Sequence, residues 1–208
     1  LQNQDLSKEN SGRQNLHTPP ELFEAWLNDG LADRVKPSTY ESYYRCVTKY
    51  VIPFFKQSRE KKITACLAGA FVNRITNDQT LSESYKRKII SVFKTALKAI
   101  LKNSGTGREI LDFIKLPKPC DSVIQVFTLQ EQQHVENTAF YYRDKAALGI
   151  ILCFYTGIRL GEVCALKWES LDTDTGSMII TQTVARVSRF RGEERKSSLI
   201  VGMPKSRR

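Results

Sequence analysis

The strongest local signals in the sequence lie in Tyr155-Thr156-Gly157-Ile158-Arg159-Leu160-Gly161-Glu162-Val163-Cys164-Ala165-Leu166-Lys167-Trp168. A ten-residue apolar run at 146–155 leads into it and predicts a buried helix. Thr156-Gly157 ends that helix, because glycine tolerates the positive φ of a helix C-terminus. Apolar residues at helical spacing then predict that a second helix starts at once: Leu160, Val163 and Leu166. Arg159 therefore lies at a tight bend between two apolar helices.

Arg159 can be interpreted in two ways. The plain interpretation is a surface arginine at a helix start, where a cation opposes the macrodipole and adds no stability. Glu162, three residues on, can offset this by pairing with Arg159 or with N–H groups of the first turn. The alternative is a binding site, because a guanidinium on a rigid corner can hold a phosphate through two parallel hydrogen bonds.

A family resemblance favours the second interpretation. Thr-Gly-Ile-Arg-Leu-Gly-Glu at 156–162, followed by Ala-Leu-Lys-Trp at 165–168, resembles the first catalytic box of the tyrosine recombinases, the phage-integrase family. The stretch is most similar to integrases of phages and conjugative transposons of Gram-positive bacteria. Seven consecutive residues with the spacing of Leu166 and Trp168 make this a specific signal. The resemblance implies that Arg159 is the first catalytic arginine and that Glu162 supports the catalytic site structurally.

The composition bounds the class of protein. A chain of 208 residues that is 41% hydrophobic and 26% charged is typical of a soluble globular protein with one large domain or two small ones. The longest apolar run is about half a membrane span, and no apolar signal segment opens the chain. Five scattered cysteines predict reduced thiols in a bacterial cytoplasm, with neither a disulfide framework nor zinc spacing. Because Leu1 is not a natural start, we expect a piece of a longer chain.

The net charge of +10 and the isoelectric point near 9.4 favour a polyanionic partner. Residues 81–118 hold nine basic and three acidic residues. Several of the basic residues lie opposite the apolar stripe of a predicted helix, where a solvated helix face is the plain interpretation. A DNA duplex would also bind such a face, with an affinity that falls steeply with salt. We assign DNA contacts to six of the nine basic residues: Arg87, Lys94, Lys98, Lys102, Lys115 and Lys118.

The N-terminal half predicts a polar tail at 1–17 and a helical domain at 18–114. Four amphipathic segments make up that domain: a helix from Thr18, one from Lys36 to Pro53, one at 64–75 and one at 82–101. The tyrosines of the second segment are expected to be core residues with exposed hydroxyls rather than platforms for DNA bases. The layout resembles the family's core-binding domain, which clamps DNA opposite the catalytic domain.

A basic stretch with two prolines predicts an interdomain linker at 115–124, so that 125–208 forms the N-terminal part of a catalytic domain. Thr128 to Glu131 is a capping box that starts a helix. The acidic cluster at 171–177 predicts a turn, and it lacks the spacing of a calcium loop.

Two strands are predicted after that turn. Alternating residues predict a strand over 178–187 and another over 198–203, joined by a charged connection at 188–197. The predicted fold class is therefore mainly α with a small antiparallel β-sheet (α+β).

The chain ends Met203-Pro204-Lys205-Ser206-Arg207-Arg208. By itself such a basic run is a disordered tail or a contact to the DNA backbone, and we assign Arg207 and Arg208 to DNA binding. A strand followed by Pro-Lys-Ser, about 46 residues after Arg159, resembles the family's β-hairpin lysine. The resemblance implies that Lys205 reaches into the minor groove and protonates the leaving 5′-oxygen.

The mechanism that the resemblance implies uses neither a cofactor nor a metal. A tyrosine hydroxyl attacks a DNA phosphate to give a 3′-phosphotyrosine, while cationic side chains stabilise the charge on phosphorus. One phosphodiester is exchanged for another, so no ATP is needed. The sequence lacks the family's His-x-x-Arg box and C-terminal tyrosine. We therefore expect a fragment of a mobile element's integrase that does not cleave DNA by itself.

The expected partners are double-stranded DNA, further copies of the chain in a tetramer on DNA, and an accessory protein that bends DNA; no membrane is expected. The alternative is a non-catalytic DNA-binding regulator with recombinase-like architecture, which a downstream sequence without His-x-x-Arg or a terminal tyrosine would favour. A basic helical RNA-binding protein would give Arg159 no role. A topoisomerase would share the chemistry but would not join two sites.

Overall fold

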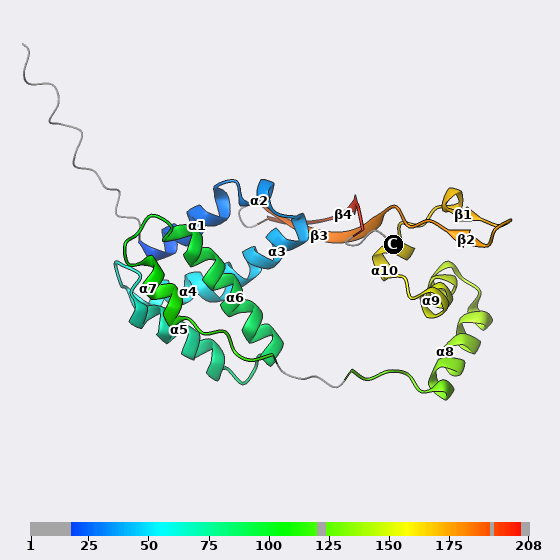
Figure 1. Cartoon of the computed structure of the whole chain (residues 1–208), viewed down its shortest axis with the longest axis horizontal. Helices are drawn as coiled ribbons and strands as arrows, with labels where there is room; N and C mark the ends of the chain where they lie inside the picture. The colour runs from blue at the N-terminus through cyan, green and yellow to red at the C-terminus, as the bar shows by residue number, and fades with distance from the viewer. Residues whose placement is uncertain (1–17, 120–123, 192–193, 205–208) are drawn as a thin grey trace, which may run out of the picture. The chain divides into compact units, whose positions relative to one another are not determined.

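The computed structural model describes residues 18–119, 124–191 and 194–204 of the chain. The chain divides into two compact units, Leu1–Asp121 and Ser122–Arg208. The described part of unit 1 is helical, and unit 2 combines helices with two small antiparallel sheets (Figure 1). The predicted fold class, mainly α with a small antiparallel β component, is confirmed. The predicted tail at 1–17 lies outside the described residues.

Unit 1 is a bundle of helices joined by short turns. In chain order these are α1 (Pro19–Asn28), α2 (Leu31–Arg34), α3 (Pro37–Cys46), the π-helical η1 (Val47–Val51), α4 (Ile52–Ser58), α5 (Ala65–Asn77), α6 (Glu83–Ile100) and α7 (Gly107–Phe113). Figure 1 shows the long helix α6 within this bundle, where it contacts α1, α3, η1, α5 and α7. The four predicted helical segments are present. The sequence analysis missed α2 and α7, which are too short to show a helical period.

The predicted helix starts follow from capping. The backbone N–H of Thr18 donates to Glu21 Oε2 at 2.8 Å, and prolines occupy the first turn of α1. Thr64 Oγ1 accepts from the Leu67 N–H at 3.2 Å at the start of α5. Each cap satisfies a backbone donor that has no partner within its own helix.

The predicted helix end at Pro53 was wrong, because the chain continues as a helix to Ser58. The turn before the proline is the π-helix η1, which changes the hydrogen-bond spacing from i→i+4 to i→i+5. Pro53 then falls in the first turn of α4, which continues from η1 without a break: the Ile52 N–H donates to Val47 O. The proline therefore changes the helix without ending it.

Four phenylalanine rings form the centre of unit 1. Phe23, Phe55, Phe71 and Phe93 are at most 1% exposed. The ring centroids of Phe71 and Phe93 lie 4.4 Å apart, and those of Phe23 and Phe55 lie 5.2 Å apart. Rings packed at these separations stabilise a core by about 0.5–1.5 kcal/mol per pair beyond their burial. The tyrosines of α3 lie partly buried against this core, as the sequence analysis expected.

Unit 2 begins with helices and ends with strands. In chain order these are α8 (Leu129–Tyr142), α9 (Lys145–Thr156), α10 (Leu160–Val163), the 3₁₀-helix η2 (Trp168–Ser170), β1 (Leu171–Asp172), β2 (Ser177–Met178), β3 (Thr183–Arg191) and β4 (Glu194–Gly202). β1 pairs with β2, and β3 pairs with β4, both antiparallel. Thr128 caps α8 together with Glu131, as predicted.

The predicted strand limits were wrong. β3 starts five residues later than predicted, at Thr183, and the charged stretch 188–197 is mostly paired strand rather than a connection. The register runs from Thr183↔Gly202 to Arg191↔Glu194. Charged residues can occupy both strands of the ribbon, because the ladder bonds are made by the backbone. Charge therefore gave the wrong signal for the connection.

The prediction that 146–155 is a buried helix was half wrong. α9 is a helix, but Ala147 is its one buried residue, and Leu148 and Tyr155 are 54% and 70% exposed. Within unit 2, α9 packs mainly on α8 and α10. These neighbours leave part of the apolar surface of α9 uncovered, so Leu148 and Tyr155 stay exposed.

Candidate functional site

The corner that presents Arg159 is built by one glycine. Gly157 ends α9 in the left-handed conformation (φ 64°), and its N–H donates to Cys153 O at 3.0 Å. The chain then extends at Arg159 (φ −79°, ψ 149°), which is the N-cap of α10. A residue with a Cβ would be strained at Gly157, so the sequence Thr-Gly is what allows the bend. The predicted bend between two helices is confirmed.

Glu162 fixes the arginine from two sides. Its Oε2 accepts from the Arg159 backbone N–H at 3.0 Å, and its Oε1 accepts from Arg159 Nη1 at 3.1 Å. The Glu162 side chain is 6% exposed, whereas that of Arg159 is 51% exposed. A buried carboxylate thus orients a half-exposed guanidinium, and its negative charge offsets the unfavourable position of a cation at a helix N-terminus.

The predicted second helix is only one turn long. α10 ends at Val163 rather than continuing through Leu166. The Ala165 and Leu166 N–H groups bond three residues back, to Glu162 O and Val163 O, both at 3.1 Å. Such i→i−3 bonds tighten and close a helix. Leu160 is 75% exposed, so its apolar character did not indicate burial.

The acidic cluster forms the turn between β1 and β2. Asp172 Oδ1 accepts from the backbone N–H groups of Asp174 (3.0 Å) and Thr175 (3.2 Å), and Oδ2 accepts from Thr175 Oγ1 at 2.7 Å. Hydrogen bonds from Thr175 lower the pKa of Asp172 below its usual value. Within residues 18–119, 124–191 and 194–204, no group of three or more His, Cys, Asp or Glu side chains is arranged for a metal ion. The carboxylate therefore serves the turn.

The predicted DNA contacts on α6 and on the segments that follow it fall into two groups. Arg87 Nη1 donates to Pro117 O, and Lys94 Nζ donates to Ile114 O at 3.0 Å; both side chains are partly buried. These two residues hold the segment that follows α7 against α6. Lys98 and Lys102, with Lys115 and Lys118, are exposed. The sequence itself does not show this difference, because Lys98 also precedes an apolar residue, Leu101, by three positions.

Lys86 also belongs to the basic excess of 81–118, yet it is buried. It is 6% exposed, and its Nζ lies 2.7 Å from Glu83 Oε1. The Lys86 ammonium is therefore paired within unit 1 and is not part of its exposed basic surface. The predicted site residues Lys205, Arg207 and Arg208 lie outside the described residues.

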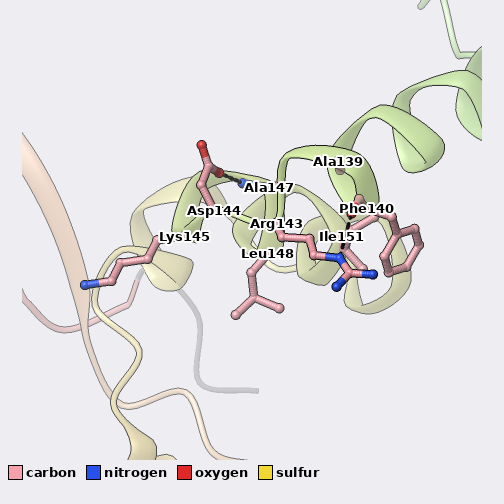
Figure 2. A pocket seen from close by; sticks show the side chains of 8 residues that line it. All are labelled: Ala139, Phe140, Arg143, Asp144, Lys145, Ala147, Leu148 and Ile151. Carbon is pink, nitrogen blue, oxygen red and sulfur yellow. Dashed lines mark hydrogen bonds between the residues drawn. The ribbon is translucent and has the colours of Figure 1, made fainter.

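An apolar hollow lies between α8 and α9 (Figure 2). Ala139, Ala147 and Ile151 line it together with the exposed Leu148. Its polar neighbours serve the helix ends: Arg143 Nε donates to Phe140 O at 3.3 Å, and Asp144 Oδ1 accepts from the Ala147 N–H at 2.7 Å. The hollow thus lies at the junction of α8 and α9, where these polar groups serve the helix ends. The Arg159 corner remains the candidate site.

None of the helices in the described part of the chain has both the length and the apolar character that a membrane crossing needs.

Comparison with known proteins gives matches in both units. Residues 127–197 match the model described as "Phage integrase family", and residues 18–75 match "Phage integrase, N-terminal SAM-like domain". The chain is 22% identical over 201 residues to a "Tyrosine recombinase XerC-like" protein of Caldanaerobacter subterraneus subsp. tengcongensis, covering 90% of this chain and 49% of that protein. The chain thus spans about half the length of this curated relative.

A solved structure shares the fold. The Tn1549 transposon integrase in complex with transposon right end DNA matches with a TM-score of 0.61 and 17% sequence identity, over 91% of this chain and 58% of that one. At this identity the likeness concerns the arrangement of helices and strands.

Proposed function

Because this chain belongs to the phage integrase family, the tyrosine recombinases, we propose that it is part of a site-specific DNA recombinase of a mobile element. The observation that carries the proposal is the Arg159 corner. A guanidinium that is half exposed and oriented by a buried carboxylate suits an anion that develops charge during reaction. DNA phosphate is the anion that the basic surface of unit 1 also favours.

The proposed reaction exchanges one ester bond of a phosphate for another. A tyrosine oxygen bonds to phosphorus and loses its proton to a base, the bond from phosphorus to the 5′-oxygen breaks, and Lys205 gives that oxygen a proton. Arg159 stabilises the non-bridging oxygens while five groups surround phosphorus. The DNA 3′-phosphate remains joined to tyrosine, and attack by a 5′-hydroxyl reverses the steps. We assign the nucleophilic tyrosine to a part of the protein beyond these 208 residues, so that the fragment alone is inactive.

Double-stranded DNA is the proposed partner, bound by several copies of the protein, with a tetramer and a DNA-bending accessory protein as the assembly that the family resemblance implies. Lys98, Lys102, Lys115 and Lys118 are the proposed contacts of unit 1 to DNA. Arg87 and Lys94 are proposed to act indirectly, by holding the segment that follows α7.

The salt dependence of DNA binding should separate the two groups of cations. Replacing Lys98 and Lys102 by glutamine should reduce the slope of log affinity against log salt by about 0.9 for each DNA phosphate that the protein no longer neutralises. The matched variant, Arg87→Gln with Lys94→Gln, removes the same charge and loosens the segment that carries Lys115 and Lys118. It should lower the affinity but change the slope less, because both side chains bond to backbone carbonyls rather than to phosphates. Fluorescence anisotropy of a labelled duplex over a range of salt concentrations measures the slope for each variant. Equal changes in slope would refute the separation of these cations into DNA contacts and residues that hold the segment after α7.

The proposed function is tested with the protein as its gene encodes it, including any sequence after Arg208. The protein is mixed with a nicked duplex that loses a short strand on cleavage and so traps the covalent complex. A protein–DNA band that survives denaturing electrophoresis and disappears after protease treatment is expected. Tight DNA binding without this band would instead favour a non-catalytic DNA-binding regulator.

A further inference from the structure

The single turn α10 carries Arg159, and its position depends on its neighbours. A single helical turn is not stable in isolation, because the conformational entropy lost in forming it exceeds the stabilisation from its few hydrogen bonds. α10 contacts α9 on one side and β3 on the other. The location of the Arg159 guanidinium is therefore set by how closely these elements approach one another.

Gly161 provides the contact with β3. A Cβ at this position would lie 2.6 Å from Thr183 Oγ1 and 2.7 Å from Val184 O, both below ordinary contact. The threonine side chain can rotate away, but the Val184 carbonyl is backbone within the ribbon and cannot. On the other side of α10, a Cβ at Gly149 of α9 would lie 3.3 Å from Val163 Cγ1, a milder contact. The closest approach in this neighbourhood is thus at Gly161.

The contact lies at the base of the ribbon. Thr183, which Gly161 touches, is the register partner of Gly202, the last residue of β4. Arg159 is two residues before Gly161 in the sequence, and Lys205 is three residues after Gly202. We propose that Gly161 is a positioning residue, which seats the Arg159 turn on the base of the ribbon and so fixes the guanidinium relative to the paired ends of β3 and β4. This inference rests on the proposed function.

A side chain at 161 should therefore reduce the rate of reaction. It has to drive α10 and β3 apart until the Cβ reaches an ordinary contact of at least 3.4 Å with Val184 O. A displacement of about 1 Å at a reacting centre costs up to about 100-fold in rate. For Gly161→Ala we expect the covalent complex to form about 10- to 100-fold more slowly at saturating DNA, with DNA affinity within about twofold of wild type.

Two further glycines give matched variants. Gly202→Ala makes the same change beside the same Thr183, but nothing lies within 4 Å of its new Cβ, so the rate should stay near that of wild type. Gly149→Ala should have an intermediate effect, since only the Val163 side chain has to move. If Gly161→Ala does not fold, the comparison of Gly149→Ala with Gly202→Ala still tests the inference, and equal rates in these two would overturn it.

A substrate with a neutral phosphate separates positioning from general destabilisation. A methylphosphonate at the cleavage site replaces one charged non-bridging oxygen by a methyl group, so a well-placed arginine has less charge to stabilise. The rate loss caused by Gly161→Ala should be several-fold smaller on this DNA than on normal DNA. An equal loss on both substrates, or no loss at all, would overturn the positioning role. Absence of any covalent complex in the wild-type protein would instead refute the proposed function.

Discussion

Replacement of Arg159 by lysine is expected to slow formation of the covalent protein–DNA complex by about 100- to 1,000-fold. Lysine keeps the charge but offers a single ammonium group in place of a planar guanidinium with two parallel N–H donors. The two carboxylate oxygens of Glu162 accept separate hydrogen bonds, one from Arg159 Nη1 and one from the Arg159 backbone N–H. A lysine at 159 would keep only the backbone bond in its present form, so the cation would also lose its orientation.

The control for this prediction is Arg186→Lys. Arg186 is an exposed arginine of β3, and the same exchange there should change the rate less than about threefold, as is usual for a surface cation. The rate is measured in single-turnover reactions with the nicked duplex at saturating protein. An Arg159→Lys protein that reacts as fast as wild type would remove Arg159 from the proposed mechanism. Equal DNA affinity in both variants would place the loss in the chemical step.

Replacement of Phe93 by alanine is expected to lower the free energy of unfolding of unit 1 by about 3–5 kcal/mol. Phe93 is fully buried on α6, and its ring meets those of Phe71 (4.4 Å), Phe23 (5.9 Å) and Phe55 (6.0 Å). Removing the central ring takes away the packing of three other rings and leaves a cavity that helices on every side prevent from collapsing. Because the free energy of unfolding of a small domain is about 5–15 kcal/mol, this substitution would remove much of the stability of unit 1.

Urea denaturation followed by the fluorescence of Trp26 measures this effect. Trp26 stacks on Tyr43 at 5.7 Å within unit 1, and a Trp168→Phe background removes the other tryptophan signal. Phe113→Ala is the matched control, because its ring is 61% exposed on the same unit, and truncation there should cost less than about 1 kcal/mol. Similar losses in both variants would contradict the assignment of Phe93 to the centre of the core.

Short sequence signals were reliable where nearby residues supply the hydrogen bonds or the backbone conformation that a helix end needs. The caps at Thr18 and Thr128 and the bend at Gly157 were predicted because each needs only a few neighbouring residues. Signals that require knowledge of a neighbour failed. Pro53 did not end its helix, since the π-helix η1 precedes it. The apolar run of α9 did not imply burial, because the elements that it packs on leave part of its apolar surface uncovered.

The candidate site shows the same division. The corner followed from the sequence alone, which also offered two partners for Glu162, the Arg159 side chain or N–H groups of the first turn. The structure shows that Glu162 binds both the side chain and the backbone N–H of Arg159. The sequence also determined the family, through a motif of consecutive residues. Only the tertiary structure decided that Arg87 and Lys94 bond to the carbonyls of Pro117 and Ile114. It also decided that Gly161 touches the first residues of β3. These contacts join residues about 20 to 30 positions apart, and no local preference encodes such a distance.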